Sequence, residues 1–196
     1  MLVFASVGTA DHGGAQCNTL EATIEGGASP INGTSGDDVI VGTEGNDVIN
    51  GLGGNDTICA LGGSDAANGG DGDDWVDAGQ GDDLHATVAG AGAYGGNGND
   101  YVTGGQGDDS VRGNMGDDVA EGGQGDDDVE GGFGNDEVHG GQGVDILLGN
   151  DGDDQLFGGP QNDDLNGGNG TDHCEVGPTN GPQAGGETTA TTACES

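Results

Sequence analysis

The chain has 196 residues, a formal net charge of -36, a single residue among Lys and Arg, and 49 glycines. So acidic a surface excludes nucleic-acid binding and adsorption to anionic membranes, which both depend on Lys and Arg. No apolar run approaches the length of a transmembrane helix, so we expect neither a nucleic-acid partner nor membrane insertion.

Residues 1–32 are expected to form an N-terminal segment that precedes the main body of the protein. A short apolar run at 2–7, followed by small residues, resembles the end of a secretory signal, and an ordinary disordered N-terminus is the alternative. Residues 24–32 match one degenerate unit of the repeat described next, with Ile31 pointing inward and Ser29 in place of an aspartate. This segment is therefore predicted to cap the first core residue without binding metal.

Residues 33–175 read as sixteen tandem units of nine residues, apart from one unit of eight at 87–94. The pattern is clearest at 104–130, where GGQGDDSVR, GNMGDDVAE and GGQGDDDVE follow one another. Glycine at positions 1, 2 and 4 permits the positive φ angles of tight turns, and the apolar residue at position 8 predicts an inward side chain of a three-residue strand. A helix is excluded, because each glycine would cost about 1 kcal/mol there.

This unit resembles the hemolysin-type (RTX) calcium-binding nonapeptide, G-G-x-G-x-D-x-U-x. The resemblance implies an all-β fold, a right-handed parallel β-roll (β-solenoid) of about eight two-repeat coils with calcium between stacked turns. It also implies that the aspartates at position 6 are the metal ligands. These are Asp38, Asp47, Asp56, Asp65, Asp74, Asp83, Asp100, Asp109, Asp118, Asp127, Asp136, Asp145, Asp154, Asp163 and Asp172.

The chemistry of the repeat supports calcium independently. Calcium takes about six to eight oxygen ligands, mostly carboxylates and carbonyls, which the aspartate and the glycine turn supply. Carboxylates stacked about 4.8 Å apart would repel one another without a cation, and so thin a core buries too little apolar area to offset the entropy of ordering the chain. Seven stacking gaps on each of two edges would hold up to about fourteen calcium ions.

Two irregular units interrupt the array. The unit at 87–94 lacks a residue and its aspartate, which is replaced by Gly92, so we expect a weakened or empty site there. Its position 8 falls on Tyr94, and the preceding unit places His85 inward, as a neutral core substitute rather than a ligand. In the turn at Pro160, Gln161 replaces the glycine of position 4. The number of calcium ions near Gly92 and near Gln161 stays open.

The four cysteines point to an oxidising, extracellular setting, because their number is even and the N-terminus resembles an export signal. Stacking in a β-roll favours the pairs Cys17–Cys59 and Cys174–Cys194 among three pairings, and free thiols or a zinc site at His173 and Cys174 are the alternatives. Residues 176–196 are expected to form a C-terminal cap or tail. The arrangement resembles secreted repeat proteins of the actinobacterial type.

No catalytic pattern is present: the sequence contains no lysine, no G-x-S-x-G, no H-E-x-x-H and no complete EF-hand loop. The aromatic residues fall at different columns and faces of the repeat, so no stripe predicts sugar binding. We therefore predict a secreted, non-enzymatic protein that folds on binding calcium. The alternatives are an ice-binding face, a surface-adhesion or filament module, and an accessory folding module of a secreted enzyme, with end-to-end self-association or a cell-surface partner.

Overall fold

A computed structural model describes residues 20, 22–25, 29–83, 92–177 and 192–194. These residues form eighteen strands and no helix, and accordingly none of their elements is a helix that could span a membrane. The strands are β1 (Ile24–Glu25), β2 (Ile31–Asn32), β3 (Val39–Thr43), β4 (Val48–Gly53), β5 (Thr57–Leu61), β6 (Ala66–Asp71), β7 (Trp75–Gln80), β8 (Gly92–Asn97), β9 (Tyr101–Gln106), β10 (Ser110–Met115), β11 (Val119–Gln124), β12 (Asp128–Phe133), β13 (Glu137–Gln142), β14 (Ile146–Asp151), β15 (Gln155–Gly159), β16 (Asp164–Asn169), β17 (His173–Val176) and β18 (Thr192–Ala193).

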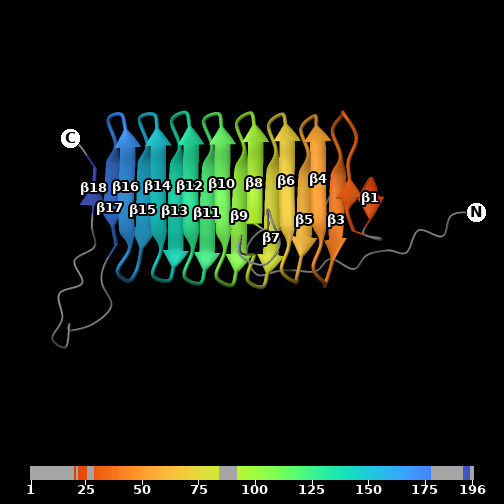
Figure 1. Cartoon of the computed structure of the whole chain (residues 1–196), viewed down its shortest axis with the longest axis horizontal. Helices are drawn as coiled ribbons and strands as arrows, with labels where there is room; N and C mark the ends of the chain where they lie inside the picture. The colour runs from red at the N-terminus through yellow and green to blue at the C-terminus, as the bar shows by residue number, and fades with distance from the viewer. Residues whose placement is uncertain (1–19, 21, 26–28, 84–91, 178–191, 195–196) are drawn as a thin grey trace, which may run out of the picture.

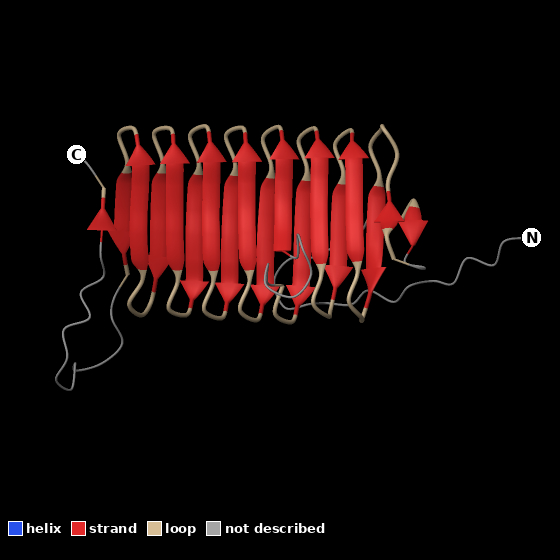
Figure 2. Cartoon of the chain, in the orientation of Figure 1, coloured by secondary structure: helices blue, strands red, loops and turns tan. Residues whose placement is uncertain are grey.

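The strands form two parallel sheets that face each other, as the predicted β-solenoid requires. Sheet A contains the odd-numbered strands from β1 to β17, and sheet B contains the even-numbered strands from β2 to β18. Each strand pairs with the strand two places away in the chain, so the chain alternates between the sheets at every turn (Figure 1). The turns are confined to the two long edges of the roll (Figure 2).

The core consists mainly of one column of inward side chains in each sheet. Position 8 supplies it, as predicted, and Val129 lies between Val111 and Leu147 in sheet B with no exposed surface. Most strands are longer than the three residues expected, because they continue through the glycines at positions 1 and 2 to position 3. Position 1 also points inward, so a glycine or alanine there lets the two sheets approach each other closely.

The strand after the irregular region has a different alignment from the one predicted. Ala93 occupies the inward column, between Ala67 and Val111, and Tyr94 faces outward. The prediction that residues 87–94 are a short unit with Tyr94 inward is therefore wrong. Asp83 and Gly92 instead hold the consecutive positions 6 and 7 of one unit, so residues 84–91 are an insertion in the sequence between them, and the described part of the array has fifteen strands from β3 to β17 rather than sixteen.

The aspartate row continues across this insertion. Asp65 N–H donates to Asp83 Oδ1 at 2.6 Å, and Asp83 N–H donates to Asp109 Oδ1 at 2.9 Å. The predicted unit with Gly92 had no carboxylate for this row. Asp83 supplies it, so the expected gap in the row of aspartates is absent. His85 lies outside the described residues.

A disulfide ties the C-terminal segment to the roll. Cys174, in β17, is bonded to Cys194, with 6.1 Å between their Cα atoms, which confirms this pair and rules out a zinc site at His173 and Cys174. Cys59 is also disulfide-bonded. Its expected partner, Cys17, lies outside the described residues.

The two ends of the array extend the same stacking. At the N-terminal end, Ile24 pairs with Ile40, and Ile31 pairs with Ile49 in the inward column, as the degenerate unit predicts. At the C-terminal end, β18 pairs with β16 and completes sheet B. The core columns are therefore covered by short strands at both ends.

Candidate metal centre

The fifteen aspartates predicted as metal ligands form two rows, one along each edge of the roll. The turns that lead into sheet A carry Asp38, Asp56, Asp74, Asp100, Asp118, Asp136, Asp154 and Asp172, and those that lead into sheet B carry Asp47, Asp65, Asp83, Asp109, Asp127, Asp145 and Asp163. All of them are buried except Asp172, which is half-buried at the C-terminal end. The structure thus brings together every residue of the predicted set.

One carboxylate oxygen of each central aspartate joins neighbouring turns. Asp127 Oδ1 accepts a hydrogen bond of 2.8 Å from Asp109 N–H, and Asp127 N–H donates to Asp145 Oδ1 at 2.9 Å. The same bond recurs along both rows, always from the turn two units earlier. It fixes the orientation of each carboxylate toward the interior of the turn.

The second oxygen of these carboxylates is buried and has no hydrogen-bond partner among the described residues. The aspartates concerned are Asp56, Asp65, Asp74, Asp83, Asp100, Asp109, Asp118, Asp127, Asp136, Asp145, Asp154, Asp163 and Asp172. A buried carboxylate oxygen without a partner is strongly unfavourable unless a cation compensates its charge. Thirteen such oxygens in two regular rows indicate a structure that requires cations.

In most of these turns the free oxygen lies in a small cradle of oxygen atoms beside a glycine at position 1. A Cβ atom built on Gly122 would lie 2.5 Å from Asp127 Oδ2 and 2.7 Å from Gly140 O. Gly104 and Gly113 show the same arrangement with Asp109 and Asp118. A side chain at these glycines would meet the converging carboxylate and carbonyl oxygens, whereas Ala60 and Ala78 are accommodated at position 1 in the units of Asp65 and Asp83.

The donor set of this cradle fits a hard cation such as calcium. Carboxylate and backbone carbonyl oxygens are the ligands that calcium prefers. Among the described residues, no group of three or more His, Cys, Asp and Glu side chains is placed to hold a metal ion. A cation in the cradle would therefore be held largely by backbone oxygens, which also argues against zinc and other metals that bind nitrogen and sulfur.

The electrostatics of the rows lead to the same conclusion. Burial, opposed by the bond from Asp109 and assisted by the charges of Asp109 and Asp145, raises the pKa of Asp127 to about 8. Burial likewise raises the pKa of Asp83 and Asp118 to about 7. A bound cation would favour the ionised carboxylates and remove this cost.

The first two turns of the array differ from all those that follow. Asp38 Oδ2 accepts hydrogen bonds from Thr34 N–H at 2.6 Å and from Thr34 Oγ1 at 2.9 Å. Asp47 Oδ2 accepts the same pair of bonds from Thr43, at 2.7 and 2.8 Å. We call these two the threonine turns; in them the protein itself satisfies the oxygen that is free elsewhere.

The backbone of the later turns has a different shape, and we call them the glycine turns. Position 2 has positive φ even where it is not glycine, as at Leu52 with 84° and Asn114 with 82°, whereas neither threonine has positive φ. Gln161, which replaces the glycine of position 4, also adopts a positive φ, of 100°. That turn keeps its shape, and Asp163 Oδ1 still accepts a bond of 3.1 Å from Asp145 N–H.

A second ladder of side-chain oxygens lies on the outer side of the same turns, at position 5. Asp126 N–H donates to Asp108 Oδ1 at 2.9 Å, and Asn135 N–H donates to Asp117 Oδ1 at 2.8 Å. These bonds run in the direction opposite to those of position 6, and asparagine serves as well as aspartate, as Asn99 shows by accepting from Asp117 N–H. The acceptor at position 5 therefore needs no charge, and Val144, which has no side-chain acceptor, still donates its N–H to Asp126.

The sequence contained signals for two of these features that the repeat pattern alone did not reveal. Thr34 and Thr43 stand where glycine is usual, four residues before an aspartate, which is the spacing of the threonine turns. The insertion is marked by two adjacent irregular units, 78–86 and 87–94. The first supplies the aspartate of one turn, and the second supplies the strand that follows it. Together they make one complete unit.

Family comparison agrees with this geometry. The model of the RTX calcium-binding nonapeptide repeat (4 copies) matches residues 32–67, 60–84, 94–129, 103–138, 112–147, 121–156 and 139–174. No curated protein matches the chain at a significant level. The repeat solenoid of this family is a structural calcium-binding fold, and the matches leave uncovered only the region of the insertion within the array. The chain belongs to the RTX calcium-binding nonapeptide repeat family.

Proposed function

We propose that this protein is a secreted structural module that folds on binding calcium. The observation that carries the proposal is the pair of rows of buried carboxylate oxygens without partners. Without calcium these charges must be either desolvated or protonated, and both cost free energy. Because the site does not exist in the unfolded chain, calcium binding and folding are one process.

The ligands in this proposal are the thirteen aspartates of the glycine turns rather than all fifteen. Asp38 and Asp47 would instead act as hydrogen-bonded caps that need no ion, because threonine occupies their second oxygen. Each ion would lie between stacked turns, held by Oδ2 and the nearby carbonyls, so the number of ions would be smaller than the fourteen expected from the repeat count. Residues 33–175 would form the calcium-binding roll, and 1–32 and 176–196 its terminal caps.

Secretion is supported by the disulfide between Cys174 and Cys194 and by the bonded state of Cys59, since such bonds persist in oxidising compartments. Extracellular calcium is also abundant enough for weak oxygen sites. End-to-end association has less support, because three of the four terminal strands, β1, β2 and β18, have two residues each and only β17 has four, so few free backbone groups are left for pairing.

The test compares Asp127→Asn with Asp126→Asn, in neighbouring positions of one turn. Asparagine at 127 keeps an acceptor for Asp109 N–H but replaces one of the two carboxylate oxygens with an amide nitrogen and removes the charge. At 126 it keeps the acceptor that Val144 N–H uses, at 2.8 Å. Far-ultraviolet circular dichroism during a calcium titration should show that Asp127→Asn needs several times more calcium to fold, and that Asp126→Asn folds close to wild type.

Two results would contradict the proposal. A β-sheet spectrum that persists in excess chelator would show that folding does not depend on calcium. Equal calcium requirements for both variants would show that position 6 is not the ligand column.

A further inference from the structure

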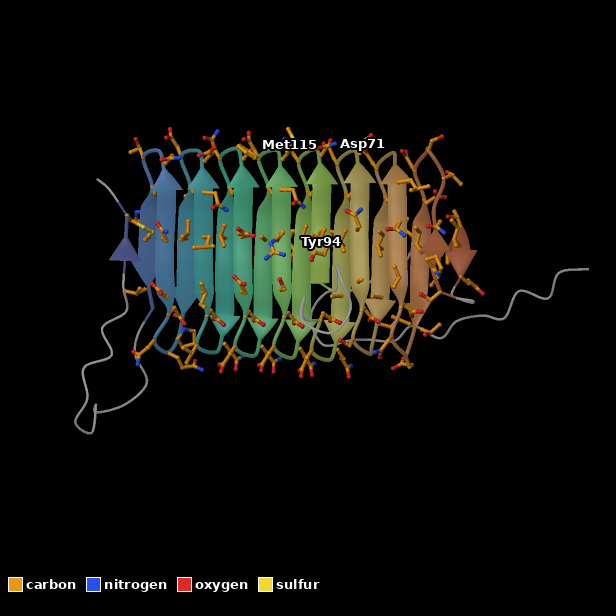
Figure 3. All side chains as sticks on the ribbon, viewed as in Figure 1. Asp71, Tyr94 and Met115 are labelled. Carbon is orange, nitrogen blue, oxygen red and sulfur yellow. A yellow bond between two sulfur atoms is a disulfide. The ribbon has the colours of Figure 1, made fainter. Side chains whose placement is uncertain are left out.

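The outer face of sheet B contains a groove that runs along the axis of the roll, perpendicular to the strands. Two open hollows form it, one over β4 to β10 and the other over β10 to β16, and they share Asn114 and Met115. The labelled side chains in Figure 3 mark its course, with Tyr94 near the middle of the strands and Asp71 and Met115 near their ends. The groove lies away from the aspartate rows, which are inside the turns.

One wall of the groove consists of the residues at position 3, which alternate in pairs between polar and apolar. Asn97 Nδ2 donates to Asp71 Oδ1, and Asn169 Nδ2 donates to Asp151 Oδ1, both at 2.6 Å. Between these pairs Met115 and Phe133 lie on adjacent strands, 55% and 61% exposed. Exposed apolar side chains flanked by polar groups are typical of binding surfaces.

The opposite wall is formed by position 9 and combines an aromatic ring with amides. The guanidinium of Arg112 lies 5.8 Å from the centre of the Tyr94 ring and forms an ion pair with Glu130. Asn50 and Asn68 continue this wall toward the N-terminal end. Tyr94 belongs to this face only because residues 84–91 are an insertion, so the prediction of aromatic residues scattered over different faces does not hold for Tyr94 and Phe133.

The charges of the groove exclude several kinds of ligand. Arg112 is the only Lys or Arg of the whole chain, and its charge is balanced by Glu130. Asp71 and Asp151 add negative charge along the opposite wall, so nucleic acids and anionic polysaccharides are repelled. A peptide that adds to the sheet would need an edge rather than a face.

We propose that this groove binds a neutral linear polysaccharide, lying along the roll. Sugar rings have apolar faces that pack on Tyr94, Met115 and Phe133, and hydroxyl groups that both donate to carboxylates and accept from amides. Each polar or apolar pair spans two strands, about 10 Å, which is close to the length of one disaccharide unit, and the full polar and apolar repeat spans four strands, about 19 Å. Successive disaccharide units of one polymer would thus meet a polar pair, the apolar pair of Met115 and Phe133, and a second polar pair in turn.

Affinity electrophoresis of the calcium-loaded, full-length protein tests this proposal. The gels would contain hydroxyethyl cellulose, mixed-linkage β-glucan or galactomannan, and in parallel alginate as an anionic polymer. At least one neutral polymer should retard the protein, and alginate should not. Titration with a hexasaccharide of the retarding polymer would then give the affinity, which Phe133→Ala should lower by about tenfold, as expected for the loss of one aromatic contact.

A matched variant on the other sheet provides the control. Phe157 lies on the outer face of sheet A, where its ring stacks on His139 at 4.9 Å, so Phe157→Ala should leave the affinity unchanged. Circular dichroism in calcium should be the same for all three proteins, which separates loss of binding from loss of the fold. Failure of every neutral polymer to retard the protein, retardation by alginate alone, or equal losses for both variants would overturn the proposal.

Discussion

The threonine turns and the glycine turns use the same aspartate column in two different ways. In the threonine turns, the N–H and hydroxyl of Thr34 or Thr43 donate to Oδ2 of the aspartate four residues later. In the glycine turns, that oxygen is buried beside a carbonyl oxygen and has no partner among the described residues. One residue at position 2 therefore distinguishes a turn that the protein completes from a turn that we infer a cation must complete.

The pKa values of the carboxyl groups reflect this difference. Hydrogen bonds from Thr34 lower the pKa of Asp38, whereas burial raises the pKa of Asp109 to about 7. Ionisation thus favours the fold in the first case and opposes it in the second. The first turns form one end of the roll, and we expect them to depend less on calcium than the rest.

The largest expected loss of stability comes from charges placed in the core column. It tests whether the threonine and glycine turns differ only in the turns themselves and not in the core beside them. The core column is common to both regions, so Ile49→Asp, after a threonine turn, and Val129→Asp, after a glycine turn, should each cost about 4 kcal/mol or more. Thermal unfolding in saturating calcium would measure both losses. Asp128→Ser, at an exposed position, is the control and should change stability little; a mild effect of either core variant would show that the two regions differ in their cores as well.

A smaller effect follows from the pKa values. The pKa of Asp127 and of Asp118 is higher in the folded state than the ordinary value of 3.8, so their contribution to the metal-free roll is fully present below about pH 4 and is lost as the pH rises through about 7 to 8. Asp38 has the opposite sign: its contribution is present above its ordinary pKa and is lost as the pH falls through its lowered value.

Circular dichroism in chelator would measure this dependence. The β-sheet signal should be larger near pH 4 than at pH 8, since the twelve glycine-turn aspartates with raised pKa values outweigh the turn at Asp38. High salt at pH 8 is the control, because it screens exposed charges and should restore less structure than acid does. Metal-free spectra that coincide over the whole range would be incompatible with the raised pKa values.

The smallest effect concerns a single turn. Thr43→Val removes the hydroxyl bond to Asp47 but retains the N–H bond, and should lower stability by about 1 kcal/mol without changing the number of bound ions. Thr43→Gly removes the hydroxyl and permits positive φ, so the turn should take the shape of a glycine turn and bind one additional calcium ion. Native mass spectrometry in calcium would count the ions; an unchanged count for Thr43→Gly would show that threonine does not decide the type of turn.

Much of this structure could be predicted from the sequence, because each column of the repeat has one physical role. The aspartates of position 6 and the core residues of position 8, such as Val129, lie where the pattern places them. The threonine turns could not be predicted from the columns, because threonine at position 2 looks like a tolerated substitution until its bonds to the aspartate are visible.

The insertion was misinterpreted for a related reason. Residues 78–94 contain 17 positions, which fit one unit of nine and one of eight as well as they fit one interrupted unit. Only the pairing of Ala67 with Ala93, and of Ala93 with Val111, decides between the two. Such pairing depends on the neighbouring strands and is not contained in the segment itself.

The insertion also reveals a parity rule for this architecture. Successive units alternate between sheets A and B, so the addition or deletion of one whole unit would transfer every later strand to the opposite sheet. Eight extra residues inside a turn leave this alternation intact, and Arg112, Phe133 and the other residues of the groove keep their common face. Lengthening such a protein without exchanging its two faces therefore requires units in pairs, or loops of any length inserted within a turn.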